Sequence, residues 1–167
     1  MSEKRDIQEN KIEYEGLFKI KELFENVKEW AEDNGFDLLQ KEYAEAVTET
    51  GKEIKMPLDL EKKASDYVKF ILLCRFSLDN VEDVLVKKGK SQQKLNKGKV
   101  VASLKAVIET DYEDKWHKKP FWIFLKGLHD KFLMSDEITE FENQIKKDLN
   151  SLADELKAHL NLFQYKT

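Results

Sequence analysis

The pattern of hydrophobic and polar positions changes from irregular to helical and then to strand-like along the first third of the chain. Residues 1–11 are polar and without a period, so we expect a disordered N-terminus, followed by a short strand over residues 12–14. From Leu17 the apolar residues recur at three- and four-residue steps, which predicts a helix over residues 17–34. Residues 36–48 are mixed and are predicted as a strand.

The middle of the chain alternates between apolar and polar residues, a pattern typical of strands in an antiparallel sheet. The predicted strands cover residues 54–61, 65–78, 81–86 and 100–109. Pro57 lacks a backbone donor, so we expect its strand at a sheet edge. Asp79-Asn80 is predicted as a turn, and residues 87–98, rich in Lys, Gly, Ser, Gln and Asn, as a loop.

The C-terminal third has helical periodicity. Pro120 suits the first turn of a helix whose apolar stripe ends near Leu133. Ser135 is a candidate N-cap for a second helix, in which apolar residues from Ile138 to Phe163 follow steps of 3, 4, 4, 3, 4, 4 and 3. This eleven-residue repeat predicts a long, straight helix that packs on the sheet, or against its copy in another subunit.

The order of these elements predicts an α+β fold. We expect an antiparallel sheet of four to five strands with one N-terminal helix and two C-terminal helices packed on one face. The chain has 167 residues with no linker and no repeat, so we expect a single domain over residues 12–167 after the disordered segment 1–11.

Composition narrows the function classes. The single cysteine, Cys74, excludes an intramolecular disulfide, and its apolar neighbours predict a buried side chain. Only two of the 29 basic residues are arginines, which disfavours base-specific recognition of nucleic acid. No apolar run approaches the length of a membrane span, and residues 1–10 lack the apolar core of a signal peptide, so we expect a cytoplasmic location.

Positive charge is concentrated in the middle of the chain. Residues 51–110 carry a net charge of +5, whereas residues 1–50 carry −7. The candidate partner-binding residues are six lysines of the predicted loop: Lys87, Lys88, Lys90, Lys94, Lys97 and Lys99. They either contact an anionic partner or form a solvated hairpin loop. Because no aromatic residue lies between them to stack on bases, nucleic acid is not the favoured partner.

Candidate catalytic and metal-binding residues are sparse. Asp114 and His117 are three residues apart and could place two ligands on one helical turn, with Asp111 and Glu113 nearby, but a metal site needs three or four converging ligands. The sequence contains no nucleophile elbow, phosphate-binding glycine loop or dinucleotide fingerprint. We therefore expect no enzymatic activity, no catalytic residue, no bound metal and no cofactor.

Aromatic residues near the C-terminus are candidates for an apolar groove or interface. The four candidates are Trp116, Trp122, Phe121 and Phe163. Trp116 and Trp122 flank Pro120 and do not both fit one buried face, which leaves apolar surface for a pocket or a partner. The alternative interpretation is packing in the core.

One stretch of the last third of the chain carries a family resemblance. It comprises Asp111-Tyr112-Glu113, Trp116, Phe124-Leu125-Lys126-Gly127-Leu128-His129-Asp130-Lys131-Phe132 and Ile138-Thr139-Glu140-Phe141-Glu142. This stretch resembles small uncharacterised archaeal proteins that end in a strand and two helices. The resemblance implies no activity and no binding residues.

Together these features favour a non-enzymatic binding or assembly protein. It would use an apolar groove between sheet and helix, or an oligomer interface, with a protein partner or self-association. The first alternative is a charge-driven module that contacts nucleic acid or an acidic partner through residues 87–99. The second alternative is a small enzyme with an unrecognised site.

Overall fold

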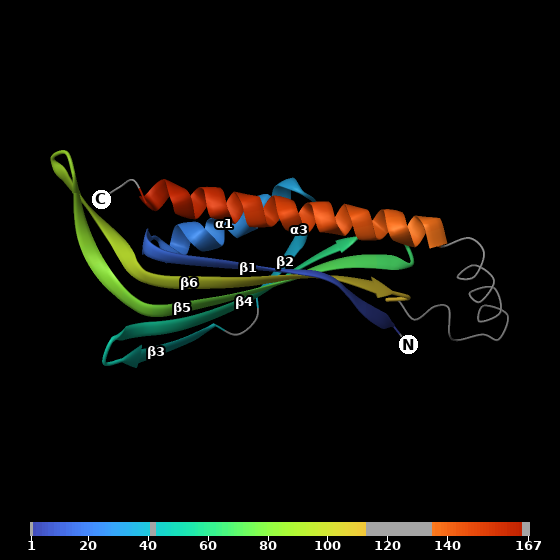
Figure 1. The fold of residues 1–167 in the computed structure, drawn as a ribbon, viewed down its shortest axis with the longest axis horizontal. Coiled ribbons are helices and arrows are strands. Elements are labelled where there is room, and N and C mark those ends of the chain that lie inside the picture. The colour runs from blue at the N-terminus through green and yellow to red at the C-terminus, as the bar shows by residue number, and fades with distance from the viewer. Residues whose placement is uncertain (1, 41–42, 113–134, 165–167) are drawn as a thin grey trace.

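The computed structural model of the chain describes residues 2–40, 43–112 and 135–164. They form an α+β fold in which two helices lie on one face of a six-stranded antiparallel sheet (Figure 1). The strands are β1 (Glu3–Phe18), β2 (Asp37–Gln40), β3 (Ala44–Thr48), β4 (Gly51–Lys63), β5 (Val68–Lys88) and β6 (Ser91–Thr110). The helices are α1 (Ile20–Asp33) and α3 (Ser135–Gln164).

The strand order places β5 and β6 at the centre of the sheet. The order is β1-β6-β5-β4-β2, and β3 pairs with a different stretch of β4. β5 and β6 have 21 and 20 residues and are the longest strands described, so their joined end extends beyond their neighbours. Figure 1 shows this end bending toward the side of the sheet that carries the helices.

The core lies between the helices and one face of the sheet. Leu58, Cys74 and Leu104 pair across β4, β5 and β6 and are fully buried. The buried residues of α3 that follow the eleven-residue repeat are Ile145, Leu149, Leu152, Leu156 and Leu160. The last helix therefore packs its apolar seam on its own sheet, and the alternative packing against another copy is not the one observed.

Polar contacts fix both helices in place. The indole Nε1 of Trp30 in α1 donates to Ser151 Oγ of α3 over 3.1 Å. Nearer the start of α3, Arg5 of β1 pairs with Glu142 over 3.0 Å. Because each contact needs a specific orientation of both partners, these pairs set the rotation of α3 that its apolar seam alone leaves open.

The expected disorder of residues 1–11 is wrong, because β1 begins at Glu3 and continues through residues 12–14. Eight of its sixteen residues are charged, so the segment shows little apolar alternation. Its extended conformation comes from the ladder with β6, in which Glu3 pairs with Thr110 and Phe18 with Asn96. These contacts between distant parts of the chain are invisible to a local pattern.

The helix predicted over residues 17–34 is confirmed as α1, although the first two predicted residues belong to β1. Residues 36–48 form two short strands rather than one. Both lie on the same side of β4, where Leu38 pairs with Leu60 and Ala44 with Lys55.

Pro57 does not mark a sheet edge. On one side of β4 it pairs with Arg75 of β5. On the other side, the pairing with β3 stops at Lys55 and the pairing with β2 begins at Leu58. The missing donor of Pro57 is tolerated because no strand of the described chain reaches that position from the β2–β3 side.

The strands predicted at 54–61 and 100–109 are confirmed within β4 and β6, whereas those at 65–78 and 81–86 form the single strand β5. The turn expected at Asp79-Asn80 is instead a bulge, where the pairing register shifts between Asp79 and Glu82. The described sheet therefore has six strands rather than four or five.

The long final helix is confirmed as α3. The other predicted C-terminal helix, from Pro120 to Leu133, lies outside the described residues, so two helices are described where three were expected. Neither of them combines the length and apolar content that crossing a membrane requires.

Candidate functional site

Cys74 lies in the core, as the sequence predicts. Its side chain is fully buried between β4 and β6, opposite Leu58 and Leu104. Burial raises the pKa of this thiol to about 12, against a lowering effect of the neighbouring Arg75. The thiol therefore stays protonated and unreactive near neutral pH.

The acidic candidates near the end of β6 are only partly described. Asp111 is 1% exposed, and its backbone N–H donates to Tyr67 O over 2.8 Å, which ties the end of β6 to the start of β5. Glu113, Asp114 and His117 lie outside the described residues. Within the described ranges, no three His, Cys, Asp or Glu side chains come together as metal ligands.

The space between the sheet and the middle of α3 is filled, because the α3 side chains from Ile145 to Leu160 that face the sheet are at most 2% exposed. At the start of α3, Ile138 and Phe141 pack on the core but are only partly buried. A hollow of about 440 Å³ does lie where β1 and β6 meet the start of α3. Arg5 and Glu142, which line it, already pair with each other over 3.0 Å.

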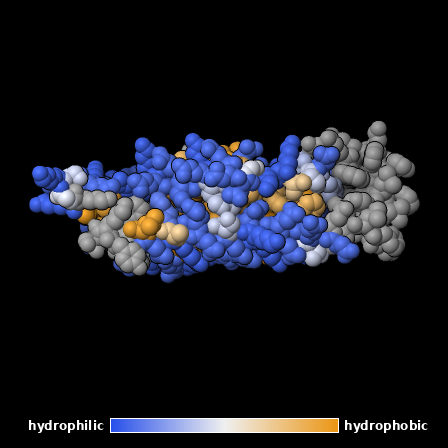
Figure 2. Space-filling model, turned by 90° about the horizontal axis from the view of Figure 1, so that it is seen from above, coloured by the Kyte–Doolittle hydropathy of each residue, from blue (hydrophilic) through white to orange (hydrophobic). Residues whose placement is uncertain are grey.

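The visible surface on the helix side is mostly hydrophilic. Figure 2 shows small, separate hydrophobic areas there rather than one continuous patch. The opposite face of the sheet carries charged pairs between strands, such as Arg75 with Asp59 at 2.7 Å and Lys105 with Asp6 at 2.8 Å. The described residues visible in Figure 2 therefore form no large apolar docking face.

The aromatic candidates cannot be placed against such a face. Trp116, Trp122 and Phe121 lie outside the described residues, and Phe163 belongs to α3 with its side chain outside the described part. The described Trp30 is 6% exposed and stacks on Phe36 with ring centroids 5.5 Å apart, so it belongs to the core.

The lysine-rich segment forms two paired strands joined by a tight turn, rather than the predicted loop. β5 and β6 pair up to Lys88 and Ser91, and Gly89 and Lys90 form the turn between them. Gly89 has a φ of 63°, which fits the first central position of a type II′ hairpin turn and which glycine adopts without strain. The pairing of β5 with β6 therefore continues through a segment that has few apolar side chains.

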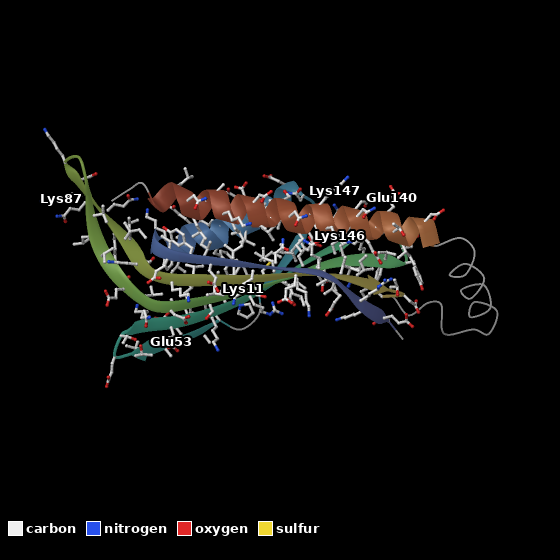
Figure 3. All side chains as sticks on the ribbon, viewed as in Figure 1. Lys11, Glu53, Lys87, Glu140, Lys146 and Lys147 are labelled. Carbon is white, nitrogen blue, oxygen red and sulfur yellow. The ribbon has the colours of Figure 1, made fainter. Side chains whose placement is uncertain are left out.

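The end of this hairpin projects beyond the sheet as a two-stranded arm. Pairing of β1 with β6 ends at Asn96, and pairing of β4 with β5 begins only at Val81. Residues 84–95, which we call the arm, therefore pair only with each other in the described structure. Figure 3 shows Lys87 near its free end, far from the labelled lysines of α3, Lys146 and Lys147.

The arm is strongly cationic and carries exposed apolar surface. It holds four lysines and no acidic residue, and the described side chains of Lys87, Lys90 and Lys94 are exposed. Of these, Lys94 pairs with Asp83 at the base of the arm over 3.4 Å. Leu85 lies among them with 68% of its surface exposed. The fourth lysine, Lys88, has its side chain outside the described part. Lys97 and Lys99 are also exposed but lie below the arm, paired with β1.

A small cluster of apolar side chains holds the arm at its base. Leu17 of β1 and Leu95, which is 1% exposed, form this cluster, and the partly buried Val84 and Val86 pack against it. Asp83, just below the arm, accepts a hydrogen bond from Asn96 Nδ2 over 2.9 Å. The arm is thus anchored, although a two-stranded ribbon is only marginally stable by itself in water.

The bulge beneath the arm sets its direction. Asn80 has a φ of 54°, and the bulge brings Asp79 against Gly98 of β6. Asp79-Asn80 and Gly98 are visible in the sequence as breaks, but they were interpreted as a turn and the end of a loop. Apolar and polar residues alternate both before and after a bulge. This alternation on the two sides of a break is the signal that could have indicated one bent hairpin.

Comparison of the chain with protein-family models, with curated proteins and with solved structures finds no match.

Proposed function

We propose that the chain is a non-enzymatic binding protein whose contact element is the arm and whose partner is a protein with an acidic surface. The observation that carries the proposal is the projection of residues 84–95 as an isolated ribbon with four lysines and no acidic residue. Pairing with a carboxylate-rich surface would complement this charge.

The exposed Leu85 supports a protein partner. Protein interfaces combine a small apolar centre with a polar rim, and Leu85 lies on the arm between exposed lysines. The arm contains neither aromatic residues nor arginines. It therefore lacks the groups that stack on bases and those that bind guanine or phosphate in bidentate fashion. Contact with a nucleic acid backbone is the weaker alternative.

The direct test is binding of a fluorescent polyglutamate peptide, followed by fluorescence anisotropy. Replacement of Lys87, Lys90 and Lys94 by Gln should weaken binding about fivefold, because two exposed ion pairs of about 0.5 kcal/mol each are lost, whereas Lys94 is already paired with Asp83. The matched control replaces three exposed helix lysines by Gln, namely Lys21, Lys28 and Lys157. This control removes the same charge and should change the affinity less than twofold.

Equal losses in the two triple variants would overturn the proposal, because binding would then follow net charge and not the arm. A single-stranded oligonucleotide of similar charge distinguishes the alternative. If it bound more tightly than polyglutamate, with log affinity falling at a slope of roughly −3 against log salt, nucleic acid would replace protein as the partner.

A further inference from the structure

β3 forms an edge of the sheet, and no described strand lies on its outer side. β3 pairs with β4 on one side, and no strand of the described chain pairs on the other. Ala44 to Val47 are all exposed, and Val47 has 79% of its surface exposed. An open edge presents unpaired backbone donors and acceptors, and an extended chain is the partner that satisfies them.

The β1 and β3 edges of the sheet differ in how well they are protected from pairing with another strand. β1 has eight charged residues among sixteen, contains a bulge between Asp6 and Gln8, and lies beside α3. β3 has a single charged residue, Glu45, and this carboxylate already accepts a hydrogen bond from Tyr43 over 2.9 Å and pairs with Lys52 over 3.5 Å. β3 therefore lacks the charges and bulges that usually prevent pairing between edges.

Alternation along β3 decides which backbone groups point outward. β3 and β4 are joined by a two-residue turn flanked by Thr48 and Gly51, and such a turn closes on a hydrogen-bonded pair. In an antiparallel ladder the bonded pairs alternate, so Ala46 also bonds to β4. Glu45 and Val47 then direct their N–H and C=O groups away from the sheet.

We propose that a second copy of this chain pairs with the outer edge of β3 in antiparallel fashion, with the two-fold axis at Ala46. In this register Glu45 lies opposite Val47 of the partner subunit, and the outward groups of the two strands form four hydrogen bonds. The sheets of both copies then join into one.

Charge disfavours the two symmetric registers centred on the neighbouring residues Glu45 and Val47. An axis at Glu45 would place two Glu45 carboxylates opposite each other, and an axis at Val47 would place Glu45 opposite Glu49 of the partner subunit. Like charges directly opposite each other destabilise a strand pair. The register centred on Ala46 avoids both contacts and leaves only small alanine side chains at the axis.

Such an interface is small, so the dimer depends on concentration. A site-specific crosslink therefore tests it more directly than a mass measurement alone. Ala46→Cys places two thiols opposite each other with Cβ atoms about 5 Å apart, close enough for a disulfide after slight adjustment. The native Cys74 is fully buried and does not compete. The control Ala44→Cys separates the thiols by four residues along the strands, roughly 13 Å.

Under mild oxidation we expect Ala46→Cys to form the covalent dimer at least tenfold faster than Ala44→Cys. Equal rates in the two variants, or no dimer from Ala46→Cys at about 0.5 mM protein, would overturn the proposed register and dimer.

Native mass spectrometry of the unmodified chain over a concentration series gives an independent test. Val47→Pro removes an outward donor without removing a bond to β4, so we expect it to abolish the dimer, whereas Val47→Thr keeps it. A dimer that survives Val47→Pro would contradict the pairing. The result is independent of the arm, because the lysine variants leave β3 unchanged.

Discussion

Gly98 of β6 lies directly against the backbone of Asp79 in β5. A Cβ atom at position 98 would be 2.8 Å from the carbonyl oxygen of Asp79 and 3.1 Å from the Cα of Val81. Both neighbours are backbone atoms of a paired strand and cannot rotate away. This close contact fixes the bulge at Asp79 and therefore the bend at which the arm leaves the sheet.

Gly98→Ala should lower the free energy of unfolding by about 1–3 kcal/mol, because the added methyl group forces two paired strands apart. Urea denaturation followed by tryptophan fluorescence measures the change. Ser103→Ala in the same strand is the control. Its hydroxyl makes a hydrogen bond with Glu9 at the exposed surface, and its loss should cost about 0.5 kcal/mol. A Gly98→Ala variant as stable as the parent chain would contradict the close contact.

Asp148 of α3 is expected to destabilise the fold at neutral pH. Partial burial raises the pKa of its carboxyl above the usual value of 3.8, although Lys62 acts in the opposite direction. Because the folded pKa exceeds the unfolded one, the cost of the charged form is present above the folded pKa and disappears as the pH falls to 3.8. Asp148→Asn should therefore be more stable than the parent chain at pH 7.

Urea denaturation of both chains at pH 7 and at about pH 3.5 tests this sign. The gain in stability of Asp148→Asn over the parent chain should be absent at the lower pH. Asp154→Asn changes an exposed residue of the same helix and serves as the control. A loss of stability in Asp148→Asn at pH 7 would mean that the attraction to Lys62 outweighs burial.

The thiol of Cys74 should not react with a disulfide reagent in the folded chain at pH 8 and should react once per chain in denaturant. Its pKa is about 12 in the fold and 9.0 in the reference state. Between these values only the unfolded state ionises, so stability falls with rising pH by up to about 1.4 kcal/mol per unit. The stability of the parent chain and of Cys74→Ala, measured at several pH values between these two pKa values, isolates this contribution. Rapid labelling of the folded chain would contradict its burial.

Local periodicity predicted the elements that bury one continuous stripe. The helix at residues 17–34, the strand at 54–61 and the last helix each place apolar residues at the spacing of their own structure, and each is present in the fold. The first part of β1 lacks such a stripe. Its charged residues face solvent beside β6, and only pairing with residues far along the chain makes this segment a strand.

The composition of the sequence indicated the candidate site, but the local sequence pattern did not indicate its shape. The lysines from Lys87 to Lys94 were recognised as a cationic surface because their charge is a property of the sequence. A hairpin was among the interpretations, but the strand pairing that continues up to Lys88 and Ser91 was not predicted, because the arm has few apolar side chains and its alternation is carried mainly by Val84, Val86 and Leu95. The bulge at Asp79 depends on a contact with Gly98, nineteen positions away, which no local window contains.

The central claim is that the arm makes the contact with the partner. Replacement of residues 85–94 by Asn-Gly removes its four lysines, while Val84 and Leu95 remain to close a two-residue hairpin on their existing pair. Leu95 stays packed on Leu17, so the rest of the fold should keep its melting temperature within a few degrees.

Fluorescence anisotropy with the polyglutamate peptide, comparing the full chain with this shortened chain, is the most direct measurement. We predict that the shortened chain binds at least tenfold more weakly at equal salt. If the folded, shortened chain binds as tightly as the full chain, the arm is not the contact element.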